Sequence, residues 1–311
     1  MNILITGGAG FQGKHLVESL IKQNHTVSVL DRHPETPKKK PSSFSDKINI
    51  IWGNITDKKT VDEAVQGNDV VFHLAAYINV DESLENPRIF YDVNVLGTLH
   101  ILEAVKKHRA RLIFISSSEV YGDGQFLKEG EKINEHSEII PRNPYAASKA
   151  AADRMCYAFS KSYNINVTIV RPFNIYGEGQ KSGVFGALIP ILTAKALRGE
   201  PLTIFGDGKT TRDYSHISDI IRGYNIILEN PDKLSGKVIN FASGKNVSVE
   251  NIAMYIAKKF NVQVKHGPAR PGEISGLQAD ISLAKSIGYT PKINIWEGLD
   301  RYIQWVQKQT D

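Results

Sequence analysis

The chain has 311 residues, of which 41% are hydrophobic and 23% are charged, and its formal net charge is +5. These proportions are ordinary for a soluble globular protein, and the length allows one large core or two unequal lobes. The single cysteine excludes a disulfide framework and a cysteine zinc site, and we expect no bound metal. No hydrophobic run approaches the ~20 residues that cross a bilayer, so we expect no membrane partner.

Two stretches of the first fifty residues bear on the location and the partners of the protein. The opening residues MNILITGG resemble a strand rather than a signal peptide, which favours a cytoplasmic location. Part of the net charge lies in the run PKKKPSSFSDK at 37–47. This run has no repeated alternation of basic and aromatic residues, so it is better explained as a solvated loop than as a nucleic-acid surface. A modest positive charge also suits an anionic small substrate.

The first half of the chain alternates between two kinds of pattern. Hydrophobic runs rich in β-branched residues predict buried parallel strands at 2–6, 26–30, 48–52, 69–75, 111–116 and 166–172. Amphipathic stretches between them predict helices at 14–24, 60–67, 94–108 and 148–163. This alternation predicts an α/β fold with a doubly wound parallel sheet of the Rossmann type.

The rhythm changes after residue 172. We expect a helix at 186–199, a short strand and turn at 201–208, a strand or loop and then a helix at 211–230, a strand at 237–243, and a helix within 246–260 capped by Ser248. The strand at 237–243 can return to the large sheet. We therefore predict an NAD-binding domain at 1–171, rejoined by 210–242, and a smaller α/β substrate lobe formed by 172–209 and 243–311.

A glycine-rich segment, TGGAGFQG, follows the first predicted strand and precedes the first predicted helix. Gly7, Gly10 and Gly13 recur every three residues. Glycines in this context let the backbone, with the intervening Phe11 and Gln12, approach a pyrophosphate at the helix N-terminus. A plain tight turn is the alternative, and the flanking strand and helix favour the dinucleotide site.

The second predicted strand ends in Asp31, 18 residues after Gly13. A carboxylate at this position can accept hydrogen bonds from both ribose hydroxyls of the adenosine half and would repel a 2′-phosphate. The sequence therefore predicts NAD rather than NADP. Arg32 follows directly and leaves the second possibility open, because an arginine can accommodate that phosphate.

The segment PYAASKAAAD places Tyr145 and Lys149 four residues apart on one face of a predicted helix. A lysine ammonium and an oxidised nicotinamide close to a phenol lower the phenol pKa from ~10 towards neutrality. The phenolate can then take a proton from a sugar hydroxyl while hydride leaves for the nicotinamide. A helix that carries this pair by chance is the alternative, and the nucleotide motif and the strand ending in serines argue against it.

These motifs occur together and in a familiar order. With HLAA at 73–76, NVLGT at 94–98, SSSEVYG at 116–122, RPFNIYG at 171–177, TRDYSHISD and RPGEI, they cover nearly the whole chain. The chain resembles the extended short-chain dehydrogenases/reductases of the NAD-dependent nucleotide-sugar epimerase/dehydratase branch. The resemblance implies NAD as cofactor and a nucleotide sugar, UDP-linked, as substrate. It is specific for the branch and poorly specific for one substrate.

The resemblance also implies roles for individual residues. Ser117 matches the hydroxyl that bonds the sugar oxygen and shares a proton with Tyr145, and Lys149 also holds the nicotinamide ribose. The cofactor cleft is matched by Leu74, Ala75, Ala76 and Asn94. The adenine contact matches Asn54 and Ile55, where the chain reads GNI instead of the usual GDI, and Asp57 can share that role. The substrate contacts are matched by Asn174 for the diphosphate, by Leu202, Thr203 and Phe205 for the base, and by Arg212 and Arg270 for the diphosphate clamp.

The reaction depends on Glu119. Members of this branch first oxidise carbon 4 of the sugar. A 4-epimerase then needs only Ser117, Tyr145 and Lys149, whereas a 4,6-dehydratase also needs a carboxylate base and a general acid. Glu119 occupies the base position, but Ser118 is a far weaker acid than the aspartic acid common in dehydratases. A 4-epimerase is therefore the favoured interpretation, and a dehydratase that uses Glu119 as base is the alternative.

Three further possibilities remain at this point. Glu119 can be a carboxylate that only caps or solvates the strand end. A Ser-Glu pair also occurs in sugar-nucleotide decarboxylases. The chain can also be an NAD-sensing module without turnover, although such modules tend to lose the Tyr-x-x-x-Lys pair that is intact here.

The small and apolar faces of 94–108 and 148–163 are similar to helices that pair across a dimer in relatives, so we expect a homodimer.

Overall fold

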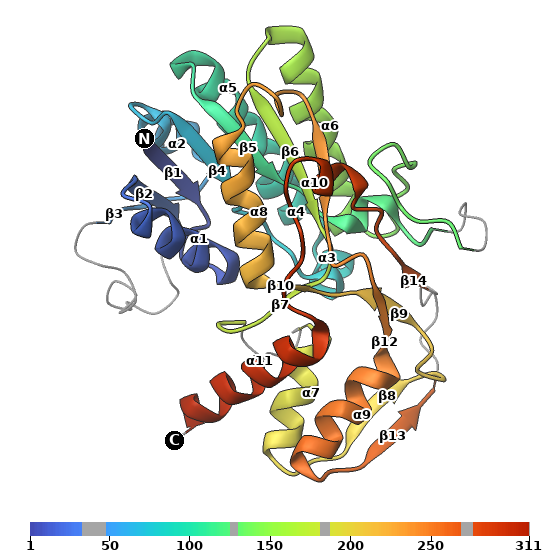
Figure 1. Ribbon diagram of the computed structural model, residues 1–311. Helices are drawn as coiled ribbons and strands as arrows, with labels where there is room; N and C mark the ends of the chain where they lie inside the picture. Colours follow the sequence, from blue (N-terminus) through green and yellow to red (C-terminus); the bar gives the residue numbers. More distant parts are fainter. Residues whose placement is uncertain (33–47, 125–129, 181–186, 269–275, 311) are drawn as a thin grey trace. The chain divides into compact units, whose positions relative to one another are not determined.

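The structure is a computed structural model that describes residues 1–32, 48–124, 130–180, 187–268 and 276–310 (Figure 1). The chain forms two compact units. The first unit comprises Met1–Val120, Pro141–Arg171 and Ile221–Ile239, and the second comprises Tyr121–Ile140, Pro172–Ile220 and Asn240–Asp311. The predicted nucleotide domain differs from the first unit mainly at 121–140 and 210–220, which belong to the second unit. The assignment of one unit to the cofactor and the other to the substrate remains a prediction.

A seven-stranded sheet runs in the order β11-β6-β5-β4-β1-β2-β3, which confirms the predicted doubly wound α/β fold. β1 pairs in parallel with β2 on one side and with β4 on the other, so the chain reverses its winding direction between β1 and β4. Ligands of such sheets bind beyond the carboxyl ends of the strands at this point. The strands are β1 (Asn2–Thr6), β2 (Thr26–Asp31), β3 (Asn49–Trp52), β4 (Val70–His73), β5 (Arg111–Ile115), β6 (Val167–Pro172) and β11 (Val238–Phe241).

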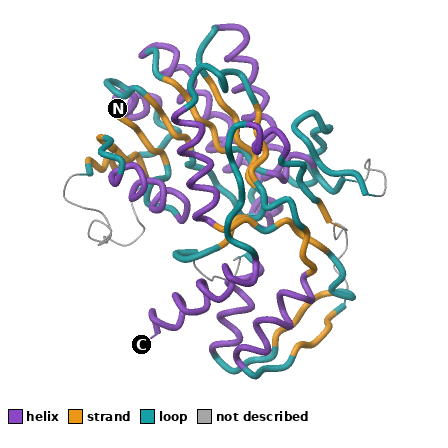
Figure 2. Tube along the Cα trace, in the orientation of Figure 1, coloured by secondary structure: helices purple, strands orange, loops and turns teal. Residues whose placement is uncertain are grey.

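Helices cover both faces of this sheet (Figure 2). On one face, Val71, Phe114 and Ile169 form a buried core with residues of the helices α2, α5 and α6. On the other face, the Phe72 ring lies 6.3 Å from the Tyr224 ring of α8, as expected because neighbouring strand residues point to opposite faces. The helices are α1 (Phe11–Lys22), α2 (Lys58–Val65), α3 (Val80–Glu85), α4 (Pro87–Phe90), α5 (Thr98–His108), α6 (Pro144–Tyr163) and α8 (Ile217–Glu229).

The helix predicted over 94–108 differs from the structure in its first turns. A π-helix, η1 (Tyr91–Gly97), precedes α5, and the two are continuous. π-helical segments are rare and often occur at functional sites, and sequence periodicity does not reveal them. Helix α6 begins at Pro144, four residues before the predicted range 148–163, because Pro144 suits its first turn and the Asn143 side chain accepts a hydrogen bond from the Ala146 amide at 2.7 Å.

The second unit contains three small sheets with the strand orders β10-β7, β12-β9-β14 and β13-β8. Its core brings together Leu192, Leu202, Ile256 and Leu299. Ser248 caps α9 as predicted, since its hydroxyl accepts from the Asn251 amide at 3.1 Å. The elements are β7 (Ile175–Tyr176), β8 (Leu202–Phe205), β9 (Thr211–Asp213), β10 (Ser215–His216), β12 (Asn246–Ser248), β13 (Val264–Gly267), β14 (Gly276–Leu277), α7 (Leu188–Leu197), α9 (Val249–Phe260), α10 (Ser282–Ser286) and α11 (Ile295–Thr310).

Among the described residues, no helix is both long enough and apolar enough to cross a membrane.

Candidate active site

The glycine segment joins β1 to α1 in the shape that a dinucleotide needs. Gly7 has φ +73°, a conformation that favours glycine, and its carbonyl oxygen accepts from the Gly10 amide at 3.1 Å. A Cβ on Gly13 would collide with the same carbonyl oxygen. Helix α1 begins after Gly10 without a side-chain cap. The N-terminus of α1 has no side-chain cap, and the glycines beside it would let the backbone come close to a pyrophosphate. These residues therefore suit a bound NAD.

Asp31 lies at the carboxyl end of β2, next to the glycine segment. Its carboxylate accepts from the Ala9 amide at 2.8 Å and from the Arg32 amide at 2.9 Å, so its orientation is fixed. Burial raises the pKa of Asp31, while the two amide donors act in the opposite direction. The guanidinium of Arg32, the group that could accept a 2′-phosphate, donates instead to the Tyr77 hydroxyl at 2.8 Å. The contact of Asp31 with the ribose remains a prediction.

The loop that the sequence predicts to line the cofactor cleft follows β4. The Ala75 amide donates to the Thr6 hydroxyl oxygen at 3.2 Å, and a Cβ on Gly7 would collide with the Ala75 backbone. The loops after β1 and β4 are therefore in direct contact. Leu74, Ala75 and Ala76 are half-buried along this loop.

Asn94 is buried and lies in η1, where its side chain fixes two other segments. Its amide oxygen accepts from the Tyr77 amide at 2.8 Å, and its nitrogen donates to the Tyr77 carbonyl at 2.9 Å and to the Ser148 hydroxyl at 2.9 Å. Ser148 in turn donates to the Tyr145 carbonyl at 2.7 Å. These hydrogen bonds fit the predicted role of Asn94, which is to support the site near the nicotinamide, because they hold the backbone of Tyr77 and, through Ser148, the backbone of Tyr145.

The predicted adenine contacts lie after β3. Asn54 is exposed, and its side-chain oxygen accepts from the Thr56 amide at 3.1 Å. Asp57 caps α2 by accepting from the Lys59 amide at 3.1 Å, so its carboxylate already has a structural role. Ile55 is buried, and a Cβ on Gly97 would collide with it.

Ser117 and Tyr145 are brought together although 28 residues separate them. Ser117 follows β5 and Tyr145 lies in the first turn of α6, where its phenol is hydrogen-bonded to the Ser117 side chain. Burial raises the pKa of Tyr145 to about 12, the charge of Glu119 adds to this rise, and the Ser117 hydrogen bond opposes it. The sequence predicts that Lys149 and an oxidised nicotinamide together lower the phenol pKa, and this prediction concerns the site with its cofactor bound. From the protein's own groups the pKa is raised, because the loss of water around the phenolate outweighs the Ser117 hydrogen bond.

Lys149 lies one turn further along α6 and is almost fully buried. Its Nζ donates to the Ile115 carbonyl at 2.6 Å and lies 4.5 Å from the centre of the Phe114 ring. Burial lowers the pKa of Lys149 to about 8, and the charges of Cys156 and Asp153 oppose this shift. The ammonium is therefore held at the carboxyl end of β5, directly before the serines.

Glu119 lies in the 3-10 turn η2 (Ser118–Tyr121) and is half-buried. Its amide donates to the Ser117 hydroxyl oxygen at 3.2 Å. Because its charge contributes to the raised pKa of Tyr145, its carboxylate acts on the Tyr145 phenol electrostatically. Ser118 is buried. The base role of Glu119 remains a prediction.

The predicted substrate residues lie in the second unit. Asn174 has φ +24°, and its side chain donates to the Asp213 carbonyl at 3.2 Å, while Arg212 donates to the Thr211 carbonyl at 2.8 Å. Phe205 is exposed and Thr203 half-buried, as a base shelf requires. Leu202 is fully buried in the core of this unit, so only its backbone can face a ligand. Arg270 lies outside the described residues.

Sequence reasoning missed two buried polar groups of the first unit. His73 makes hydrogen bonds through both ring nitrogens, to Thr6 at 2.7 Å and Thr98 at 3.0 Å. Asp153, one turn after Lys149, pairs with Arg171 through bonds of 2.8 Å and 2.9 Å. A buried Asp on the Lys149 face of α6 was a usable signal, because Asp is rarely buried without a partner.

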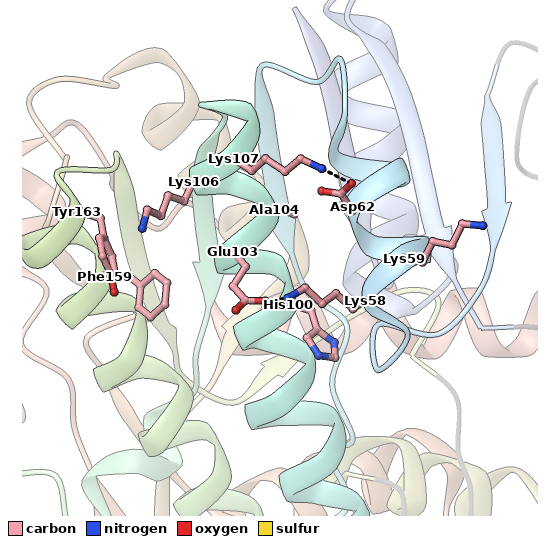
Figure 3. Close-up of a pocket in the computed structure, with 10 residues that line it drawn as sticks. All are labelled: Lys58, Lys59, Asp62, His100, Glu103, Ala104, Lys106, Lys107, Phe159 and Tyr163. Carbon is pink, nitrogen blue, oxygen red and sulfur yellow. Dashed lines mark hydrogen bonds and ion pairs between the residues drawn. The ribbon is translucent and has the colours of Figure 1, made fainter.

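A separate groove of about 740 Å³ lies on the outer surface of α2, α5 and α6 and contains none of the predicted site residues (Figure 3). In it, Lys107 pairs with Asp62 at 2.6 Å, and the Lys106 ammonium lies 3.6 Å from the centre of the Tyr163 ring. The groove is lined by Lys58, Lys59, Asp62, His100, Glu103, Ala104, Lys106, Lys107, Phe159 and Tyr163. Within the described part of the chain, no group of three or more His, Cys, Asp or Glu side chains could hold a metal ion.

Comparisons of the sequence and of the structure with known proteins find enzymes that act on nucleotide sugars. The model of the "NAD dependent epimerase/dehydratase family" matches residues 3–242. A putative UDP-glucose 4-epimerase of Methanocaldococcus jannaschii is 34% identical over 98% of both chains. A UDP-N-acetyl-alpha-D-glucosaminuronate decarboxylase of Bacillus cytotoxicus is also 34% identical, over 98% of this chain and 97% of its own. The structure of a UDP-glucuronic acid 4-epimerase from Bacillus cereus, in complex with UDP-glucuronic acid and NAD, superposes with a TM-score of 0.89 at 29% identity and covers 99% of this chain and 100% of its own.

Proposed function

Because this chain belongs to the NAD-dependent epimerase/dehydratase family, we propose that it is a nucleotide-sugar 4-epimerase of the UDP-hexose type. Its cofactor is NAD, on which the family depends and which similar structures contain. Its relatives include epimerases, a decarboxylase and dehydratases, so the choice of an epimerase is ours. The observation that carries this choice is the hydrogen-bonded pair of Ser117 and Tyr145 with Lys149 on the next turn, which is the complete set that epimerisation needs.

The reaction proceeds through a transient 4-keto sugar. Tyr145 takes the proton of the hydroxyl on carbon 4, and Ser117 hydrogen-bonds the same sugar oxygen. When bound, NAD supplies the hydride acceptor and donor and a positive ring that favours the phenolate. Loss of the hydroxyl proton to Tyr145 and of the carbon-bound hydrogen, with its electron pair, to the acceptor that NAD would supply would leave a ketone at carbon 4. If the ketone then presented its other face, the same groups would act in reverse, with Tyr145 returning the proton to the oxygen, and no net oxidation would result.

For this chemistry the pKa of the Tyr145 phenol must fall from its value of about 12. The Ser117 hydrogen bond lowers this pKa, and the charge of Glu119 raises it. The positive charges of Lys149 and of a bound nicotinamide would favour the phenolate.

A dehydratase is the second candidate, and the closeness of Glu119 to the phenol supports it. In that reaction Glu119 would take the proton from carbon 5 of the 4-keto sugar, and the hydroxyl on carbon 6 would leave as water. Ser118 stands where a general acid is needed, and its hydroxyl is a poor one. This is why we place the dehydratase second.

Product masses separate the candidates. The protein is incubated with UDP-glucose, UDP-N-acetylglucosamine, UDP-glucuronate and dTDP-glucose. An isomer of unchanged mass supports the epimerase, a loss of ~18 mass units a dehydratase, and a loss of ~44 a decarboxylase. Glu119→Gln should leave epimerisation largely intact and abolish dehydration. Glu103→Gln, which alters an exposed ion pair with Lys58, serves as the control and should change neither. A Glu119→Gln variant that loses epimerisation would contradict the proposal.

We also propose that two copies of the chain associate through α5 and α6. Four large side chains of α6 and of η1, which adjoins α5, are exposed: Tyr91 at 42%, Leu96 at 42%, Tyr157 at 39% and Tyr163 at 48%. Burying such side chains between two copies would be favourable by ~25 cal/mol per Å² of apolar surface. The groove of Figure 3 lies on the same helices.

A further inference from the structure

His73 is a fully buried polar residue at the end of β4, and both of its ring nitrogens have partners. Nδ1 lies 2.7 Å from the Thr6 hydroxyl oxygen, and Nε2 lies 3.0 Å from the Thr98 hydroxyl oxygen. Thr6 ends β1 and Thr98 begins α5. The ring therefore connects two strands of the sheet to the helix that covers it.

The neighbouring hydrogen bonds determine which nitrogen carries the proton. The Thr98 hydroxyl donates its single proton to the Asn94 carbonyl at 2.6 Å, so its oxygen accepts from His73, and Nε2 must carry hydrogen. Nδ1 of the neutral ring then accepts from the Thr6 hydroxyl, whose oxygen in turn accepts from the Ala75 amide at 3.2 Å. In this series of hydrogen bonds, from the Ala75 amide to the Asn94 carbonyl, each donor has one acceptor.

A second proton on His73 would break this arrangement. It would sit on Nδ1, facing the Thr6 hydroxyl, and would force that hydroxyl proton to find another acceptor. Burial lowers the pKa of His73 to about 3, and the positive charge of Lys149 acts in the same direction. The hydrogen bonds and the burial therefore both favour the neutral ring.

The two ends of the chain of hydrogen bonds hold two halves of the site. Thr6 fixes the Ala75 amide, which belongs to the loop in contact with Gly7. Thr98 fixes the Asn94 carbonyl, and the Asn94 side chain holds both the backbone of Tyr77 and, through Ser148, the first turn of α6.

We propose that His73 is a positioning residue, a neutral imidazole with its proton on Nε2 that ties the NAD-binding loops to the turn of α6 that carries Tyr145. The link from His73 to NAD binding rests on the NAD dependence of the family, whereas the link from His73 to Tyr145 rests on the proposed function. Two readouts, the tautomer and amide exchange, need no sugar substrate.

Two substitutions separate the halves, because the amide of Asn reaches about as far as Nδ1 and the amide of Gln about as far as Nε2. His73→Asn keeps an acceptor for Thr6 and loses the donor to Thr98. His73→Gln keeps the donor to Thr98 and loses the acceptor for Thr6. A buried partner left unsatisfied corresponds to a change of roughly 5- to 150-fold in an equilibrium constant.

We expect His73→Gln to raise the Kd for NAD and the amide exchange rate of Ala75 about tenfold, and to keep kcat at saturating NAD within about threefold. His73→Asn should lower kcat and speed exchange at the Tyr77 amide about tenfold, and keep the NAD affinity within about threefold. Thr6→Val and Thr98→Val, which remove one hydroxyl at nearly constant volume, should reproduce His73→Gln and His73→Asn respectively, and they carry the test if either histidine variant does not fold.

The tautomer is read from the ¹⁵N shifts of His73, which should be those of an Nε2–H ring from pH 6 to pH 9. An Nδ1–H or doubly protonated ring, or equal losses of NAD affinity and exchange protection in both histidine variants, would overturn the proposal. If the wild-type protein converts no sugar nucleotide, the proposed function fails, and the tautomer, the Kd for NAD and the two amides still decide the role of His73.

Discussion

Lys149 is a buried cation, and its burial costs the native state free energy that a neutral side chain would not. Burial lowers its pKa from 10.5 to about 8. Since one pKa unit corresponds to ~1.4 kcal/mol, the charged lysine destabilises the native state by roughly 3 kcal/mol at neutral pH. The unfolded chain keeps this proton up to about pH 10.5, whereas the native state releases it above about pH 8. The unfolded state therefore binds more protons in this window, and native stability rises with pH there.

Lys149→Met removes this pH dependence. Integrated from pH 7 to pH 9.5, the difference in bound protons amounts to about 2 kcal/mol. The free energy of unfolding of the wild-type protein, minus that of the variant, should therefore increase by about 2 kcal/mol between these pH values. The variant also loses the hydrogen bond to the Ile115 carbonyl, but this loss is the same at both pH values and cancels.

Urea unfolding of both proteins at pH 7 and pH 9.5 measures the difference. Lys161→Met, which removes an exposed lysine from the same helix, is the matched control and should stay within ~0.5 kcal/mol of wild type at both pH values. A difference between wild type and Lys149→Met that does not change from pH 7 to pH 9.5 would refute the reasoning. It would mean that Lys149 is hydrated in the native state.

Three further outcomes are expected. Gly13→Ala should abolish measurable NAD binding in a fluorescence titration, because the added methyl group collides with the Gly7 carbonyl, and retained affinity would contradict the proposed pyrophosphate cradle. Asp153→Asn should lower the free energy of unfolding by ~3–5 kcal/mol, because it leaves the buried Arg171 guanidinium without its charge partner, and Asp153→Asn with Arg171→Met should recover part of the loss in urea unfolding. Tyr163→Glu should shift the mass measured by light scattering from dimer to monomer, and a dimer that persists would place the interface elsewhere.

The sequence was informative where local patterns decide structure. Strand-like hydrophobic runs predicted the sheet, and the glycines every three residues predicted a tight turn. In the structure Gly7 has positive φ and Gly13 has no room for a side chain. The Tyr145 and Lys149 spacing predicted a shared helix face correctly. Each of these features depends on a few neighbouring residues.

Features that depend on distant contacts were not predictable in the same way. The direction of the Tyr145 pKa shift is set by burial, which no spacing encodes. Leu202 was predicted as part of the base shelf, and that its side chain lies in the core, which leaves its backbone for such a contact, was not evident from the sequence. The role of His73 depends on Thr6 and Thr98, which lie 67 and 25 residues away.

The π-helix Tyr91–Gly97 has a consequence for how this segment can change in length. A π-turn holds one residue more than an α-turn, and each residue of an α-helix turns by roughly 100°. Deleting one residue between Tyr91 and Gly97 would therefore close the wide turn into a continuous α-helix with little rotation of the flanking turns, whereas inserting one more residue would rotate Asn94 by roughly 100° relative to the buried face of α5. After such an insertion, either Asn94 would leave Tyr77 and Ser148, or Ile101 and Val105 would leave the sheet. Single-residue insertions in this segment should therefore be far less tolerated than substitutions of its exposed side chains.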